Sequence, residues 1–225
     1  MKKIYILVIF LLLLSGCSKS DLKKYYENMS IKFNKIQGYK LDLRIVGNTD
    51  KIIVNKTIKI SNFRNTDYEI STANIIKNMF DAFKNGKTAL NDNYDKIYII
   101  NNKVYEEDEN LKLVKSSKKL SSIKYRNPNT YLEGLINVKK VKKIIDLTIL
   151  KEKYKVYDVI VNKKYISKIV TDTGIKFEGK KDCSAKIYID KYKRVNKIIY
   201  TIEGITITAT YYDINIATEI AISNN

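Results

Sequence analysis

The chain has 225 residues and carries 42 Lys and Arg against 24 Asp and Glu, a formal net charge of +18. It contains no histidine, which excludes histidine-based triads, general bases and metal ligands. Hydrophobic residues make up 44% of the chain, enough for a packed core, while two cysteines are too few for a cysteine-ligated zinc site. No cofactor is expected.

The first seventeen residues have the pattern of an export signal. Lys2 and Lys3 form a basic head, residues 4–14 carry no charge, and Leu14-Ser15-Gly16-Cys17 precedes an abrupt change to polar residues. The apolar run is too short for a membrane-spanning helix, which needs about 20 residues. A basic head before a short apolar core is typical of a secretory signal peptide. The segment Leu14-Ser15-Gly16-Cys17 resembles the lipobox of bacterial lipoproteins.

The lipobox resemblance implies cleavage between Gly16 and Cys17 and a diacylglyceryl group on the Cys17 sulfur. Residues 1–16 are then the signal peptide and residues 17–225 a single lipoprotein domain. Two or more acyl chains hold a protein durably on a membrane, which predicts the extracytoplasmic face of a bacterial cell membrane. Cys183 is left without a disulfide partner and is predicted to be a buried thiol.

The positive charge has two interpretations. A basic exported protein suits anionic head groups or wall polymers, whereas nucleic acid is not expected as a partner outside the cytoplasm. The same excess of Lys, Ile, Asn and Tyr is what codon bias in an AT-rich genome produces. The sequence does not define an oligomeric state.

Residues 22–36 have helical spacing. Apolar side chains recur every three or four residues and comprise Leu22, Tyr25, Tyr26, Met29, Phe33 and Ile36. Asp21 is predicted to be the N-cap of this helix and Gly38 its C-terminal glycine. The helix would start almost at the predicted lipid anchor.

From residue 39 the apolar period changes to two, which is typical of antiparallel strands with one buried face. Turn residues such as Asn101-Asn102 separate the segments. The predicted strands are 39–45, 52–60, 68–71, 96–100, 103–105, 111–114, 144–150, 154–161, 166–171, 175–178, 185–190, 195–203 and 205–212.

Two segments interrupt the strands. Residues 73–95 form a predicted insertion with a short amphipathic helix and a loop, in which Asp92, Asn93 and Asp95 invite a calcium hypothesis. The glycine and the distal Glu of an EF-hand loop are missing, so no metal site is predicted. A second helix is predicted over residues 131–138, after a turn set by the only proline.

Two motifs in the second half of the chain indicate a family. Tyr125-Arg126-Asn127-Pro128 precedes Tyr131-Leu132, and the last strand ends in Tyr211-Tyr212-Asp213-Ile214-Asn215 before Glu219-Ile220-Ala221-Ile222. With the lipobox and the first helix, these features resemble the LolA-like and LppX/LprG-like bacterial lipoproteins, which end in an aromatic strand, a similar turn and a short tail. The 73–95 insertion departs from that family's pattern.

The resemblance implies an α+β fold: a curved antiparallel sheet, open as a half-barrel, with a few helices over its concave face. Several members of the family bind lipids or lipidated proteins in the apolar space between sheet and helices. The corresponding candidate ligand face here consists of Leu41, Leu43, Ile45, Ile58, Ile189 and Ile207. A filled and an open concavity have the same strand alternation, and the sequence alone favours a closed core packed by residues 22–36 and 131–138.

Three functions are compatible with the lipobox, the strand pattern and the basic composition. The first is a membrane-anchored protein that binds a lipid or another hydrophobic or acylated ligand. The second is a structural or interaction lipoprotein whose basic, Tyr-rich surface binds anionic polymers, head groups or a protein partner. The third is a carboxylate-dependent hydrolase, but Glu133, Glu152, Asp158 and Glu178 are isolated in the sequence. The first function is predicted, and no enzymatic activity is expected.

Overall fold

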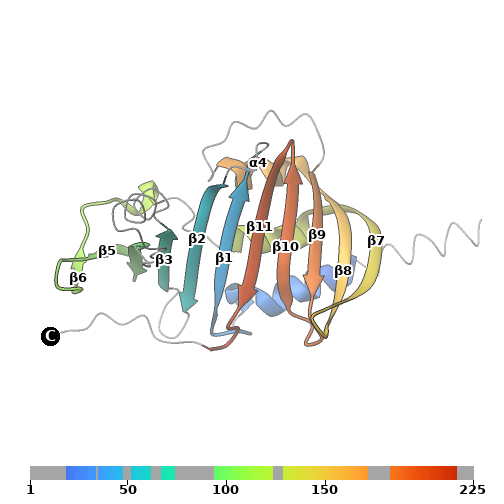
Figure 1. Cartoon of the computed structure of the whole chain (residues 1–225), viewed down its shortest axis with the longest axis horizontal. Helices are drawn as coiled ribbons and strands as arrows, with labels where there is room; N and C mark the ends of the chain where they lie inside the picture. The colour runs from blue at the N-terminus through green and yellow to red at the C-terminus, as the bar shows by residue number, and fades with distance from the viewer. Residues whose placement is uncertain are drawn as a thin grey trace, which may run out of the picture.

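The computed structural model describes residues 19–33, 35–47, 52–61, 67–73, 94–123, 129–171 and 183–216. In these residues eleven strands form one antiparallel sheet in the order β6-β5-β4-β3-β2-β1-β11-β10-β9-β8-β7 (Figure 1). The two outer strands, β6 and β7, do not pair with each other, so the sheet is open. The expected α+β class with a curved antiparallel sheet is confirmed.

The first half of the chain forms a six-stranded meander. Its strands are β1 (Gly38–Val46), β2 (Ile52–Ser61), β3 (Asp67–Ala73), β4 (Tyr94–Ile100), β5 (Lys103–Glu107) and β6 (Leu113–Lys115). Asn101 and Asn102 join β4 to β5 with φ values of 50° and 61°. Two consecutive positive φ values fit a tight hairpin turn, and asparagine tolerates them better than most residues do.

The second half forms a five-stranded meander that returns to β1. Its strands are β7 (Val138–Ile149), β8 (Glu152–Val161), β9 (Cys183–Ile189), β10 (Val195–Ile202) and β11 (Ile205–Tyr212). β11 pairs with β1 in an antiparallel register that runs from Lys40 opposite Tyr212 to Val46 opposite Thr206. This pairing joins the two meanders into one sheet.

A turn after β11 fastens this junction. Asp213 and Asn215 have φ values of 49° and 65°, which their short polar side chains tolerate. The Asn215 N–H donates to the Gly38 carbonyl at 2.9 Å, and the Gln37 N–H donates to Asn215 Oδ1 at 3.0 Å. The aromatic–Asp–Asn ending noted in the sequence therefore ties the end of β11 to the start of β1.

Short helices cover one face of the sheet and lie behind it in Figure 1. They are a helix that includes residues 19–29, the 3₁₀ turns η1 (Ile31–Phe33) and η3 (Glu133–Asn137), and the α-helices α3 (Asn129–Leu132) and α4 (Lys163–Thr171); a further 3₁₀ turn, η2 (Leu120–Ser122), follows β6. Their buried side chains pack with the sheet in one hydrophobic cluster and include Leu22, Tyr26, Met29, Tyr131, Leu132, Leu135, Tyr165, Ile166 and Ile169.

Four local predictions were wrong. Asp21 lies inside the first helix, which already includes residue 19, and Gly38 opens β1 instead of ending a helix. Residues 166–171 form most of α4, where Asn162 accepts the Lys164 N–H at 3.1 Å and starts the helix. The strand predicted over residues 144–150 is β7, which begins at Val138, six residues earlier than predicted.

Several predictions lie outside the described residues. These are the signal peptide with Gly16 and Cys17, the helix within 73–95 together with Asp92 and Asn93 of the calcium hypothesis, the strand at 175–178 with Glu178, and the tail after residue 216, whereas Asp95 lies in β4. In the part of the chain that the structure describes, no helix is long and apolar enough to span a bilayer.

Gly134 allows the helical cover to approach the sheet. A Cβ atom at this position would lie 1.9 Å from the Tyr200 hydroxyl oxygen, and that hydroxyl donates to the Tyr131 carbonyl at 2.6 Å. Because Tyr200 is fully buried, its ring has no free space into which it could move. The glycine is therefore required by close packing.

We predict that Gly134→Ala lowers the free energy of unfolding by about 1–3 kcal/mol, the usual cost of overpacking a core. Chemical denaturation followed by far-UV circular dichroism measures the loss. Adding Tyr200→Phe should recover part of it, because the nearest clashing atom is the hydroxyl oxygen. A fully stable Gly134→Ala variant would show that η3 does not pack against Tyr200 as described.

Candidate ligand-binding site

A pocket of about 520 Å³ lies between the first helix and one end of the sheet. Tyr25 lines it from the helix side, and Ile189 lines it from β9. Residues from three further segments complete the wall, and most of them are polar or charged: Asp146, Leu147 and Thr148 of β7, Lys153, Tyr154 and Lys155 of β8, and Asp190, Lys191 and Lys193 of the β9–β10 turn. A pocket above about 300 Å³ has room for a small-molecule ligand.

The position of Tyr25 follows from the spacing of the first helix. Leu22, Tyr26 and Met29 face the sheet and are buried, which leaves Tyr25 at the border of the core. Its ring packs edge-on against Tyr157 of β8, with centroids 6.0 Å apart, and the two hydroxyls lie 3.4 Å apart. Burial is the main reason why the pKa of Tyr157 is raised above its ordinary value. The apolar part of the pocket is thus continuous with the core.

The β9–β10 turn is held in place by Asp190. Its carboxylate accepts the backbone N–H groups of Tyr192 and Arg194 at 2.8 and 2.9 Å and pairs with the Arg194 guanidinium at 3.1 Å. Lys193 has a φ of 60°, which places it at the tight point of the turn. The Asp190 charge is therefore neutralised within the turn, while Lys191 and Lys193 remain at the pocket.

The pocket mouth is basic. Four lysines line it (Lys153, Lys155, Lys191 and Lys193) against Asp146 and Asp190, and Asp190 is paired with Arg194. Within the described ranges, none of these four lysines forms an ion pair. A pocket that combines the apolar side chains Tyr25 and Ile189 with four lysines suits an amphipathic ligand with a negatively charged head.

The six residues of the candidate ligand face are brought together on one side of the sheet. All of them are at most 2% exposed and belong to the same hydrophobic cluster (Leu41, Leu43, Ile45, Ile58, Ile189 and Ile207). Ile189 also lines the described pocket, whereas the other five do not. The role of this face in ligand binding stays a prediction.

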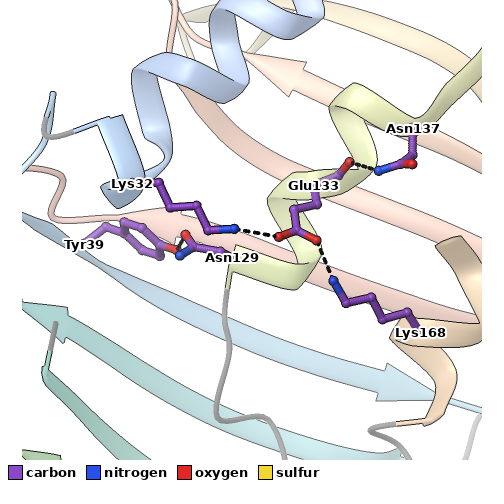
Figure 2. Close-up of polar contacts among 6 residues, drawn as sticks. All are labelled: Lys32, Tyr39, Asn129, Glu133, Asn137 and Lys168. Atoms are coloured by element: carbon purple, nitrogen blue, oxygen red, sulfur yellow. Dashed lines mark hydrogen bonds and ion pairs between the residues drawn. The ribbon is translucent and has the colours of Figure 1, made fainter. Parts of the chain in front are cut away.

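A polar clamp joins the helices that cover this face (Figure 2). The Glu133 carboxylate of η3 pairs with Lys32 of η1 at 3.3 Å and with Lys168 of α4 at 2.8 Å. Nearby, the buried Tyr39 hydroxyl of β1 donates to Asn129 Oδ1 at 3.3 Å. The clamp ties three helical segments to one another and to the sheet.

Helical spacing placed Tyr25 and Tyr26 on an apolar face, and the structure buries many more tyrosines than this spacing indicates. Eight of the described tyrosines are buried: Tyr26, Tyr39, Tyr98, Tyr131, Tyr157, Tyr165, Tyr200 and Tyr211. Burial raises the pKa of Tyr165, Tyr200 and Tyr211 well above the ordinary value. These side chains therefore do not supply a Tyr-rich outer surface, which the interaction-lipoprotein hypothesis needs.

Cys183 is a buried free thiol, as predicted. Burial raises its pKa from 9.0 to about 12, so the reactive thiolate is scarce near neutral pH. A raised folded-state pKa stabilises the fold fully below pH 9. That contribution is lost as the pH rises towards 12, because the unfolded thiol releases its proton first.

We therefore predict that iodoacetamide labels Cys183 at least about a hundredfold more slowly in the native protein than in denaturant at pH 8. Intact-mass spectrometry over a time course gives both rates. Similar rates in the two conditions would contradict the buried position of this thiol.

The comparisons with known proteins support the fold. No protein-family model and no curated protein matches the sequence. The chain is similar in structure to the lipoprotein LppX of Mycobacterium tuberculosis (TM-score 0.58, 9% identity, 92% of this chain and 99% of LppX covered). It is also similar to LprF of Mycobacterium bovis (TM-score 0.60, 10% identity, 92% and 97% covered).

These two likenesses establish the LppX-like fold that the sequence motifs indicated. A LolA superfamily protein of Nitrosomonas europaea, NE2245, also matches over 90% of this chain at 8% identity, with a TM-score of 0.35 that supports no further conclusion. Identities of 9% and 10% show the arrangement of the chain and leave the ligand to be argued from the site.

Proposed function

We propose that this protein is an extracytoplasmic lipoprotein, anchored through lipid on Cys17, that binds an amphipathic lipid or acylated ligand between the first helix and the sheet. The observation that carries the proposal is the 520 Å³ pocket, which opens beside the apolar core and is edged by lysines. An acyl chain fits the apolar side, and a phosphate or carboxylate head fits the basic mouth. The match to a structure described as a lipoprotein supports the anchored location.

We also propose that the protein acts by binding and not by catalysis. Glu133 is neutralised by two lysines from other segments, and Asp158 lies opposite Lys143 and Lys186 in the neighbouring strands. A two-carboxylate hydrolase needs an acid and a base that face one substrate. Among the described residues, no three acidic or cysteine side chains gather where they could hold a metal.

The ligand proposal is tested by native mass spectrometry of protein extracted from cell membranes. We expect a mass adduct that dissociates as a lipid, with anionic species enriched over their share in the membrane. A protein that carries no adduct and does not take up a fluorescent anionic lipid from vesicles would contradict the proposal.

Filling the pocket should abolish this binding. Thr148 is exposed and lines the pocket from β7, so Thr148→Trp adds a large ring there at little cost to the core. We expect loss of the lipid adduct with an unchanged melting temperature. Thr208→Trp, the same change on the opposite face of β11, is the matched control and should keep the adduct. Lipid binding by the Thr148→Trp variant would place the ligand elsewhere.

Anchoring is tested by counting thiols. The chain has two cysteines, and Cys183 becomes reactive on unfolding. If the Cys17 sulfur forms a thioether, denatured protein from membranes should contain one titratable thiol, and Cys17→Ser should release the protein from the membrane fraction. Two thiols in membrane-extracted protein would overturn the anchoring.

A further inference from the structure

The outer face of the sheet changes character at its β7 end. Over β1, β11 and β10 most side chains that point away from the helices are charged or small and polar, as in the row Asp42, Thr210 and Lys197, with Ile199 and Tyr212 as larger exceptions. In β7 the outward positions become Ile145, Leu147 and Ile149, which are 40–42% exposed, and Leu150 in the following turn is 94% exposed. These outward residues occupy every second position of the strand and together form an apolar patch, whereas a sheet face that contacts only water is usually polar.

The patch continues across the neighbouring strands. Ile145 lies opposite Val156, which lies opposite Tyr188, while Leu147 lies opposite Tyr154. Tyr154 and Tyr188 pack edge-on with centroids 6.3 Å apart, and the Lys197 ammonium sits 5.8 Å from the Tyr188 ring centroid. We call the set Ile145, Leu147, Ile149, Leu150, Tyr154 and Tyr188 the β7–β9 patch.

Lysines surround this patch. The first half of β7 contains Lys139, Lys140, Lys142 and Lys143, and Lys151 follows Leu150 at the other end. Aliphatic side chains at the centre with tyrosine and lysine at the border are typical of surfaces that enter the interface of a lipid bilayer. Anionic head groups attract such lysines by about 1 kcal/mol each.

The start of the first helix lies at the same edge. The Lys19 ammonium donates to the Lys139 carbonyl at 2.8 Å, and the helix begins beside β7 in Figure 1. Cys17 precedes Lys19 by two residues, a span of at most about 7 Å of extended chain. An acyl group on Cys17 would therefore enter the bilayer beside β7.

We propose that β7 lies on the membrane surface, with the β7–β9 patch in the bilayer interface and the flanking lysines on anionic head groups. The proposal rests on the proposed anchoring at Cys17. The lipid on Cys17 would hold the start of β7 at the membrane and the β7–β9 patch would hold its end, so the two contacts together fix the orientation of the sheet relative to the bilayer. The occupant is a lipid surface and not a second copy of the chain. Removal of Lys2 and Lys3 with the signal peptide lowers the formal charge from +18 to +16, and two such chains repel each other while an anionic surface attracts both.

The experiment uses lipidated protein reconstituted in vesicles of equimolar phosphatidylglycerol and phosphatidylcholine. Ile145→Cys and Ile149→Cys each receive a nitroxide, because Cys17 is blocked by lipid and Cys183 is buried. Val114→Cys on the far outer strand β6 and Ile136→Cys on η3 are matched controls, as their native side chains are 46% and 47% exposed. Accessibility to lipid-soluble oxygen and to a water-soluble nickel chelate is measured by electron paramagnetic resonance.

We expect the labels at 145 and 149 to be several-fold more accessible to oxygen than to the chelate, and the labels at 114 and 136 to show the reverse. Labels at 145 and 149 that behave like the controls would overturn the proposal. Dipolar broadening between labels at 145 without vesicles would overturn it as well, since the patch would then join two copies. The thiol count separates the two proposals. If the denatured protein has one titratable thiol and the label at 149 is exposed to water, the anchoring stands and the membrane contact of the patch is rejected. If the denatured protein has two titratable thiols, the anchoring is rejected.

Discussion

The pairing of β1 with β11 is the interaction on which the rest of this structure depends. It joins residues about 170 positions apart in sequence, from Lys40–Tyr212 to Val46–Thr206. Without it the chain would form two separate meanders, each with an additional unpaired edge, and no continuous face for the helices to cover. The turn at Asp213 and Asn215 stabilises this pairing, and because the contact is so distant in sequence we expect it to form late in folding.

The sequence predicted what depends on local periodicity. Most strands were placed correctly because apolar residues alternate along them. The motif Tyr211–Asn215 indicated the LppX-like fold, and its turn ties the end of β11 to the start of β1. The α4 helix was missed because Ile166, Ile169 and their β-branched neighbours favour strand locally, although Tyr165, Ile166 and Ile169 also have the spacing of one helix face. Asn162 as an N-cap was the signal that could have identified it.

The pocket could not be predicted in the same way. Its wall combines the first helix, the β7–β8 hairpin and the β9–β10 turn, whose proximity follows from sheet topology and not from any one segment. Alternation identified the buried face but could not show where the volume beneath the helices is left unfilled. The outward Ile145, Leu147 and Ile149 were identified as a strand, yet only the register with β8 shows which face they occupy.

The clamp and the pocket lie at different parts of the helical cover, and this difference bears on ligand exchange. At the end of the first helix, Glu133 links η1 and α4 through two ion pairs, and the buried Tyr39–Asn129 hydrogen bond reinforces the same region. Towards the start of the helix, the Lys19 ammonium donates to the Lys139 carbonyl and the Tyr25 and Tyr157 hydroxyls approach to 3.4 Å. The Lys19 contact is exposed and the Tyr25–Tyr157 contact is long for a hydrogen bond between hydroxyls. These polar contacts therefore hold the helix more weakly beside the pocket than the two ion pairs do at the clamp. A ligand would therefore enter where the helix meets β7, the edge that the proposed anchor and the proposed membrane contact of the β7–β9 patch would bring to the lipid, and it would not have to cross water.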